Sequence, residues 1–226
     1  MKHNVEVDNV IMNNNKVTLH DQTFKKIEAK GECELNLFNC NIIDLNIEIS
    51  DNSSLLINYF NLINKLDTKI NVNANNKSAF ILNHSFLNNE KYNLEVNTFF
   101  KSEEASITVN INGINDKGTL MSSVNGYVDN EKFNNTLDEN MRVINLNNGK
   151  VTSNPNMYIS TSKVIANHNT TIGSVREDEL LYLMSKGINK ENAIKLICKG
   201  FLTRIISNEE MCKQIKKEYE GGDLNA

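Results

Sequence analysis

Alternation of apolar and polar residues dominates the chain from about residue 16 to residue 166. The clearest stretches are 34–39, 44–49, 69–74 and 106–112. A period of two places apolar side chains on one face of a strand, as in half-buried β-sheets. Short polar breaks such as 75–78, 88–91 and 147–150 separate these stretches and supply turn residues, but none is long enough to form a helix. The first two thirds of the chain therefore predict ten or more short strands.

The pattern of these strands is compatible with a sandwich, a barrel or a solenoid. Hairpin turns favour the dipeptide Asn-Gly, and this Asn-rich chain has only three of them, at 112–113, 125–126 and 148–149. The strands also recur as similar short runs with similar breaks, as in stacked coils. Both features favour a solenoid, although no fixed repeat length can be extracted.

The pattern changes at Ser174, and the next forty or so residues predict helices. Ser174 and Glu177 form a capping box, and an apolar stripe follows it until Gly187 ends the helix. Asn189 can cap a second helix, and a second capping box at 207–210 opens a third. The stripe of the first helix is Leu180, Leu181, Leu183 and Met184, and that of the second is Ala193, Ile194, Leu196, Ile197 and Phe201.

Three regions are therefore predicted. Residues 1–173 form the β core, residues 174–220 form a C-terminal helical segment, and residues 221–226 form a disordered tail. Asn is abundant throughout, whereas Pro155 is the single proline. Repeated Asn can form hydrogen-bonded ladders between stacked strands, or it can reflect an AT-rich genome. The sequence leaves both explanations open.

Charge and targeting signals exclude several classes of protein. The net charge is −4, and the basic residues are spread among acidic ones, so nucleic-acid binding is not expected. The first residues lack a basic region followed by an apolar run, and no stretch of eighteen apolar residues occurs, so we expect neither secretion nor a membrane span. The four cysteines form no CxxC pair, which fits a reducing, cytoplasmic location.

Few residues suggest chemistry on their own. No histidine has a second ligand at a recognisable metal spacing, and no nucleotide-binding or hydrolase motif is present. The acidic run after Arg176 could face a cleft, but acidic side chains in a first helical turn are also favoured by the helix dipole. Cys198 and Cys212 fall in predicted helices as small buried hydrophobes. Cys33 and Cys40 would point to opposite faces of an unbroken strand.

Three segments near the end of the chain resemble the C-terminal signature of the SufB/SufD family. They are residues 154–159, 164–173 and 177–188. In that family a proline-containing strand precedes a strand with a His, and then come an acidic pair and two helices. Here the landmarks are Pro155, His168, Glu177-Asp178, the turn Lys186-Gly187 and the pair Gly200-Phe201. The resemblance covers about residues 140–206.

The resemblance implies a right-handed parallel β-helix core followed by a small C-terminal helical segment. It also implies a non-enzymatic role in iron–sulfur cluster assembly, with a cluster held transiently or only in complex with a partner. The expected partners are a SufC-type ATPase, which docks on the C-terminal helices, and a SufB/SufD-type scaffold subunit or a second copy of the chain, which pairs through the last β coils.

The resemblance carries over to a few residues only. His168 matches the histidine of SufD-type subunits and is the expected metal ligand, since a neutral imidazole can bind iron. Glu177 or Asp178 matches an acidic position near the nascent cluster in SufB-type subunits. Gly149 stands where SufB-type proteins carry a cluster cysteine, which favours a SufD-like role.

The chain also lacks the N-terminal helical domain of typical members, so it is expected to be a short, divergent one. A metal-free β-solenoid that binds or supports other molecules is the alternative, and it predicts aromatic stripes along one face. A β-helical lyase or hydrolase would need convergent acids and bases, for which the sequence gives no pattern. The cluster type and the number of coils cannot be read from the sequence.

Overall fold

The computed structural model describes residues 5–221, and twelve strands and three helices form this part of the chain. The strands are β1 (Val5–Asn13), β2 (Lys16–His20), β3 (Gln22–Lys30), β4 (Glu32–Phe38), β5 (Asp44–Ile49), β6 (Ser54–Ala74), β7 (Ala79–Phe100), β8 (Ser106–Asp116), β9 (Thr119–Val128), β10 (Asn135–Leu146), β11 (Lys150–Ile159) and β12 (Val164–Gly173). The helices are α1 (Glu177–Ser185), α2 (Lys190–Thr203) and α3 (Glu209–Gly221).

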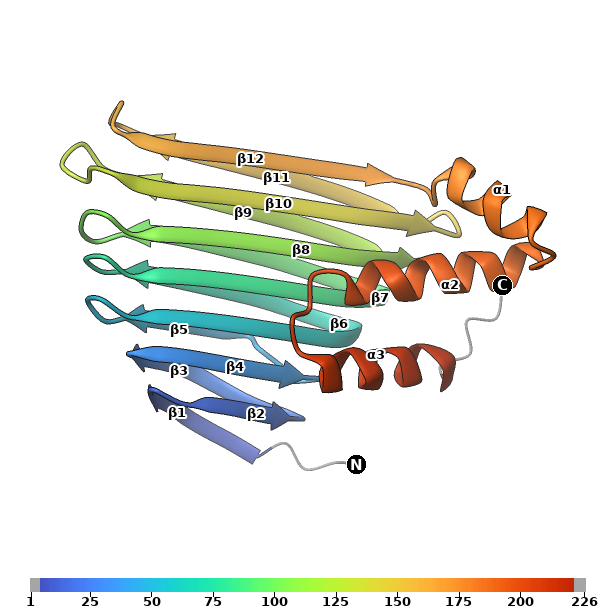
Figure 1. Ribbon diagram of the computed structural model, residues 1–226, viewed down its shortest axis with the longest axis horizontal. Coiled ribbons are helices and arrows are strands. Elements are labelled where there is room, and N and C mark those ends of the chain that lie inside the picture. Colours follow the sequence, from blue (N-terminus) through green and yellow to red (C-terminus); the bar gives the residue numbers. More distant parts are fainter. Residues whose placement is uncertain (1–4, 222–226) are drawn as a thin grey trace.

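The strands stack as a right-handed parallel β-solenoid, which confirms the expected fold class (Figure 1). One face is built by β2, β4, the first halves of β6 and β7, then β8, β10 and β12. The opposite face is built by β1, β3, β5, the second halves of β6 and β7, then β9 and β11. Every pairing within the described chain is parallel, because each coil brings the chain back to the same face in the same direction.

The coil lengthens along the chain, which explains why no fixed repeat is visible in the sequence. Val5 pairs with Gln22 in the first coil, whereas Thr119 pairs with Lys150 near the end, a much larger step along the sequence. Figure 1 shows the result as a stack that widens from β1 and β2 towards β12. A search for repeats of one length therefore has nothing constant to detect.

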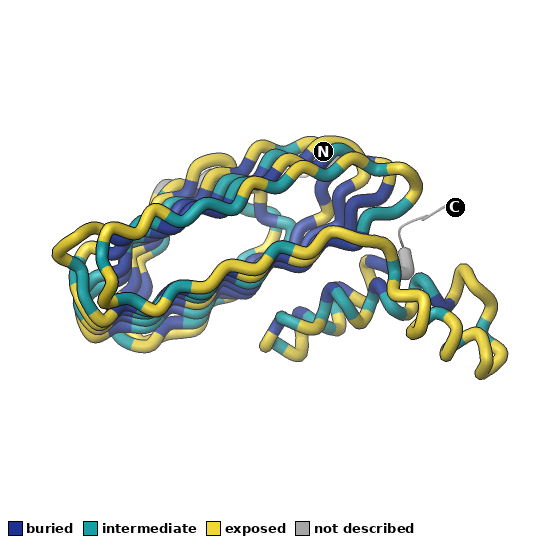
Figure 2. Tube along the Cα trace, turned by 90° about the horizontal axis from the view of Figure 1, so that it is seen from above, coloured by how far each residue is buried: buried dark blue, intermediate teal, exposed yellow. Residues whose placement is uncertain are grey.

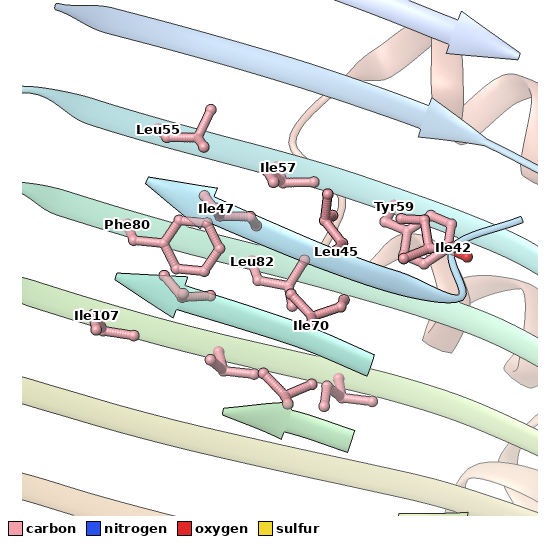
Figure 3. Close-up of a cluster of buried hydrophobic side chains, with 14 of the residues drawn as sticks. Ile42, Leu45, Ile47, Leu55, Ile57, Tyr59, Ile70, Phe80, Leu82 and Ile107 are labelled. Atoms are coloured by element: carbon pink, nitrogen blue, oxygen red, sulfur yellow. The ribbon is translucent and has the colours of Figure 1, made fainter. Parts of the chain in front are cut away.

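The space between the two faces is filled by inward-pointing apolar side chains. Leu55 and Ile57 alternate along β6 and are each 1% exposed. Phe80 and Leu82 of β7 lie in register with them in the next coil. Figure 3 shows these side chains meeting those of β5, such as Ile47, from the opposite face. Burial of this continuous apolar core is the main stabilising contribution to the fold.

Asparagine forms hydrogen-bonded ladders that run up the stack, so the abundance of this residue has a structural role. On one face each side-chain amide donates to the Oδ1 of the Asn one coil earlier, at 2.9 to 3.4 Å. An equivalent ladder follows the other face, at 2.8 to 3.1 Å. The members are Asn36, Asn58, Asn83, Asn110 and Asn140 on the first face, and Asn46, Asn71, Asn97, Asn125 and Asn156 on the second.

Asparagine also occupies many corners of the coil. Ten non-glycine residues in the described chain adopt positive φ, and six of them are Asn, which tolerates this conformation better than most residues. Two of the three Asn-Gly pairs lie inside strands, at 112–113 and 125–126, and a Cβ on Gly113 would clash with the Phe86 ring. These two Asn-Gly pairs therefore form no hairpin turns, and the scarcity of hairpin dipeptides correctly indicated a solenoid.

Helices α2 and α3 pack against one long side of the flattened coil (Figure 2). Their apolar side chains, among them Leu202 and Ile215, share a buried cluster with Phe60 and Ile114 of the strands. Polar contacts fix the end of α2, because Ser85 Oγ donates to the Leu202 carbonyl at 2.7 Å and Asn112 Nδ2 donates to the Phe201 carbonyl at 2.8 Å. These bonds satisfy carbonyls that a helix end leaves unpaired.

The helix starts differ in part from the sequence expectations. Asn189 caps α2 as expected, accepting from the Asn192 amide at 2.9 Å. The capping box at Ser174 is wrong, because α1 begins after Arg176, whose side chain makes no cap. The cap of α3 is Asn208 rather than Ser207, since Ser207 instead bonds Asn58 of the first ladder.

The predicted regions map onto the structure as follows. The last strand ends at Gly173 and α1 starts at Glu177, on either side of the expected boundary at 173–174. Gly221 still belongs to α3, and the rest of the predicted disordered tail, 222–226, lies outside the described residues. Within the described chain, the helices are too short or too polar to cross a membrane.

Candidate functional site

The C-terminal end of the solenoid is an open edge. Strand β12 pairs only with β10, and β11 pairs only with β9, so within the described chain each has one unpaired side. Pro155 lies in β11, where an edge strand tolerates the missing N–H of proline. Unpaired backbone groups at such an edge favour pairing with another strand.

His168 lies in the middle of β12, on this open edge. Its register partner is Glu139 of β10. Ala166 and Val164, two and four residues earlier, pack partly against the solenoid core, so alternation along the strand places His168 in the row that continues the interior. With no further coil above it, the imidazole is exposed. The ring is thus available to a partner or a metal ion at the end of the stack.

Glu177 and Asp178 lie in the first turn of α1, beyond the end of β12. Gly173 follows His168 by five positions on the same strand, which is about 16 Å of chain at about 3.3 Å per residue. Asp178 accepts a hydrogen bond from Arg176 Nε at 3.1 Å, and this interaction lowers the pKa of Asp178. The structure therefore does not bring the two acidic residues together with His168 within one chain.

No group of three or more His, Cys, Asp and Glu side chains in the described residues could hold a metal ion. Cys33 and Cys40 both point into the same apolar core, and the condition for opposite faces, an unbroken strand, is not met. The strand does not run unbroken between them, because β4 ends at Phe38 and the chain turns at Asn39 with a φ of 52°. Cys198 is fully buried in the helical cluster, as expected of a small hydrophobe.

Gly149 lies in the turn that joins β10 to β11. The family resemblance matches this position to the cluster cysteine of SufB-type proteins. A Cβ at this position would clash with Asn115 Nδ2 and would lie 3.1 Å from the carbonyl oxygen of Gly118. A larger side chain here requires the third Asn row, Asn88–Asn115–Asn145, to shift. The local packing is therefore built for glycine.

Glu139 is an unusual residue that the sequence analysis did not single out. Its side chain points into the solenoid and is 3% exposed, and within the described chain its only hydrogen bond comes from Thr98 Oγ1 to Oε1 at 3.4 Å. Oε2 has no partner among the described residues. Burial raises the pKa of Glu139 to about 7. The available signal was its place in the alternation Leu137, Glu139, Met141, where every second residue faces inward.

The first helix exposes apolar side chains. None of its residues is buried, and Leu181 and Tyr182 are 58% and 63% exposed. Leu196 of α2 lines the same surface hollow as Tyr182 and is 49% exposed. Of the apolar stripe predicted for this helix, Leu181 and Met184 are exposed, whereas Leu180 and Leu183 are partly buried.

A protein family and individual relatives resemble parts of this chain. The family model described as "SUF system FeS cluster assembly, SufBD core domain" matches residues 47–201, which include most of the solenoid and the first two helices. An iron–sulfur cluster assembly protein SufD of Bacillus subtilis is 39% identical over 66 residues, which are 29% of this chain and 15% of that protein.

Two further relatives are SufBD family proteins of iron–sulfur cluster assembly. The one from Pyrococcus horikoshii is 37% identical over 65 residues, covering 29% of this chain and 13% of its own length. The one from Mycobacterium leprae is 34% identical over 73 residues, covering 32% and 19%. The matched segments thus span less than a fifth of each relative. Because the family model covers more than half of the chain, this protein belongs to the SufBD core family of the SUF system.

Proposed function

We propose that this chain is a non-catalytic scaffold subunit of an iron–sulfur cluster assembly complex in the cytoplasm. The observation that carries the proposal is the match of the SufBD core family across both the solenoid and its first helices. The open edge with His168 and the exposed face of α1 lie at the matched end of the chain. Gly149 favours a SufD-like rather than a SufB-like role.

The cluster is the cargo of such a complex, and this chain supplies only part of its site. His168 is the proposed metal ligand, because an exposed imidazole on a rigid strand can bind iron through a neutral nitrogen. Since the described residues offer no group of three ligands, a partner must contribute the others. Glu177 and Asp178 are proposed to face the cluster region of that partner.

Pairing through the last coils is proposed for the scaffold partner, either a SufB/SufD-type subunit or a second copy of this chain. The unpaired edges of β11 and β12 provide backbone donors and acceptors for such a contact. Apolar side chains at this end are also uncovered, and Ile165 is 65% and Tyr158 is 54% exposed. Docking of a SufC-type ATPase is proposed for the exposed face of α1.

The test is an anaerobic co-purification of the tagged chain with the proteins of its own cell, followed by iron and sulfide assays. We expect an ATPase and a scaffold subunit to be recovered together with iron and sulfide. His168→Ala should lower the bound iron severalfold while leaving thermal unfolding unchanged, and Asn169→Ala is the matched control on the same strand. Wild-type iron in the His168 variant would exclude it as a ligand.

A metal-free binding solenoid is the second candidate, and one observation favours it. Phe99, Tyr127 and Tyr158 stack face to face along one edge, with ring centroids 4.8 and 4.9 Å apart. A sugar ring stacks on a free aromatic face, and within this row Tyr158, as the last member, has a face that no other ring of the row covers. Recovery of neither an ATPase nor iron in the co-purification, together with binding to an oligosaccharide panel, would establish this candidate instead.

A further inference from the structure

A cavity of about 370 Å³ lies between the ends of β10 and β12 and the helices α1 and α2. Its apolar wall comes from Ile144 of β10 and from Leu196 and Phe201 of α2. Small-molecule pockets usually have volumes of about 300–1,000 Å³ and mainly apolar walls with a few polar groups. The cavity lies at the joint between the solenoid and the helical segment, and Figure 1 shows this joint where β12 leads into α1.

All three arginines of the chain line this single cavity. They are Arg142 of β10, Arg176 directly before α1, and Arg204 directly after α2. The chain has 24 basic residues, and the others are all lysines. Three arginines from three separate elements therefore converge where the rest of the protein uses lysine.

The fold explains how these arginines come together. Arg142 pairs in register with Asn112, whose amide donates to the Phe201 carbonyl at 2.8 Å, so Arg142 lies beside the end of α2. Arg204 follows Phe201 by three residues, which places both on the same side of a helical turn. The polar contact that docks α2 on the solenoid thus also positions two guanidinium groups at the cavity.

The charges in the cavity are only partly balanced. Arg176 pairs with Asp178 and lies 3.7 Å from Glu179, the one acidic residue in the lining. Arg142 and Arg204 have no hydrogen bond or ion pair within the described chain. Two guanidinium groups next to an apolar wall are therefore free to bind an anion.

We propose that this cavity binds a small organic anion, with a carboxylate or phosphate group held by Arg142 and Arg204 and an apolar body against Leu196 and Phe201. Arginine suits such a ligand, because its planar guanidinium donates two parallel hydrogen bonds to an oxyanion and also stacks on flat apolar groups. The volume of the cavity favours a small molecule over a protein segment. This site does not depend on the proposed role in cluster assembly.

The proposal is tested by isothermal titration calorimetry of the full chain with four probes at equal ionic strength. The probes are phenyl phosphate, inorganic phosphate, benzyl alcohol and a blocked acidic peptide. Phenyl phosphate should bind about tenfold or more tightly than the inorganic ion, the neutral alcohol or the peptide. R142Q/R204Q should weaken its binding by about tenfold or more, while thermal unfolding stays unchanged.

The matched control is Lys190→Gln, which removes an exposed cation from the first turn of α2 outside the cavity. This variant should bind phenyl phosphate as the wild type does. Equal binding of phenyl phosphate by the wild type and R142Q/R204Q overturns the proposal. If phenyl phosphate and benzyl alcohol bind equally, the proposal that the cavity recognises an anionic group is wrong. If the peptide binds more tightly than phenyl phosphate, the proposal of a small-molecule ligand is wrong and the cavity binds a protein segment.

Discussion

The middle and the C-terminal end of this molecule use the same residue types at equivalent positions but bury them differently. In β8 the inward residues Ile107, Val109 and Ile111 are at most 1% exposed, whereas Ile172 in the inward row of β12 is 43% exposed. The helices repeat this contrast. Leu202 of α2 is fully buried, and Leu181 of α1 is 58% exposed.

Position in the stack, rather than local sequence, causes this difference. An inward side chain of a middle coil is covered by coils above and below, whereas one in the last coil is covered from one side only. The middle therefore supplies most of the stability, and the end keeps apolar and backbone groups available for a partner. Substitutions that alter stability should cluster in the middle, and those that alter binding should cluster at the end.

The largest expected effect on stability is for Phe86→Ala. Phe86 is fully buried, packs over Gly113 and forms an edge contact with Tyr92 at 4.9 Å between ring centroids. Its truncation leaves a cavity and should lower the free energy of unfolding by about 3–5 kcal/mol. Urea unfolding followed by circular dichroism measures the loss. Ile165→Ala on β12 is the control and should change stability by less than about 0.5 kcal/mol.

Glu139 should make stability depend on pH in an unusual direction. Burial raises its pKa from 4.5 to about 7, so the folded state favours the protonated carboxyl. This contribution is fully present below about pH 4.5 and is lost as the pH rises through about 7, a change of about 3 kcal/mol. Unfolding free energies from pH 5 to pH 8 should therefore decline in the wild type.

The variant Glu139→Gln should remove most of this decline, because its amide does not titrate. Asp138→Asn is the matched control, since Asp138 faces outward on the same strand and accepts from Asn167 at 2.9 Å. A wild-type slope in the Glu139 variant would show that another group causes the pH dependence.

A break in the middle of an asparagine ladder should cost more than a break at the end of one. Asn97 is the middle member of the second ladder, and Asn140 is the last member of the first. Asn97 is 5% exposed, donates to Asn71 and accepts from Asn125 at 2.8 Å. Asn97→Ala leaves both neighbours with an unpaired polar atom, at a cost of about 1–3 kcal/mol. Asn140→Ala breaks one exposed bond of 3.4 Å and should cost less than about 0.5 kcal/mol. Equal losses in thermal unfolding would contradict a cooperative ladder.

The strands and helices were predictable, because alternation and apolar stripes are local, but of the three expected helix caps only Asn189 was correct. The length of the coil was not predictable, since it grows along the stack, from the step Val5–Gln22 to the step Thr119–Lys150, and no repeat search at a fixed period detects it. The same growth hides which Asn residues stack. Neighbours in the two five-membered ladders lie from 22 to 31 positions apart in the sequence, and only the register reveals them.

The candidate site was predictable only as separate residues. The sequence singled out His168, Glu177 and Asp178, but a strand end and a turn separate the first from the other two. Their roles stay predictions. Glu139 escaped notice although its place between Leu137 and Met141 in the alternation marked it as an inward position. The convergence of three arginines from distant elements is a tertiary feature with no local signal.

The smallest expected effect on stability, with a large effect on binding, is for Leu181→Asp. Leu181 is 58% exposed on α1, so its replacement should change the free energy of unfolding by less than about 0.5 kcal/mol. A charge in the centre of the proposed docking face should nevertheless abolish co-purification of the ATPase, because its desolvation has no compensating partner. Ile11→Asp is the matched control, since Ile11 is 74% exposed at the opposite end of the solenoid. Retention of the ATPase by the Leu181 variant, or its loss in both variants, would mean that the apolar face of α1 does not bind this partner.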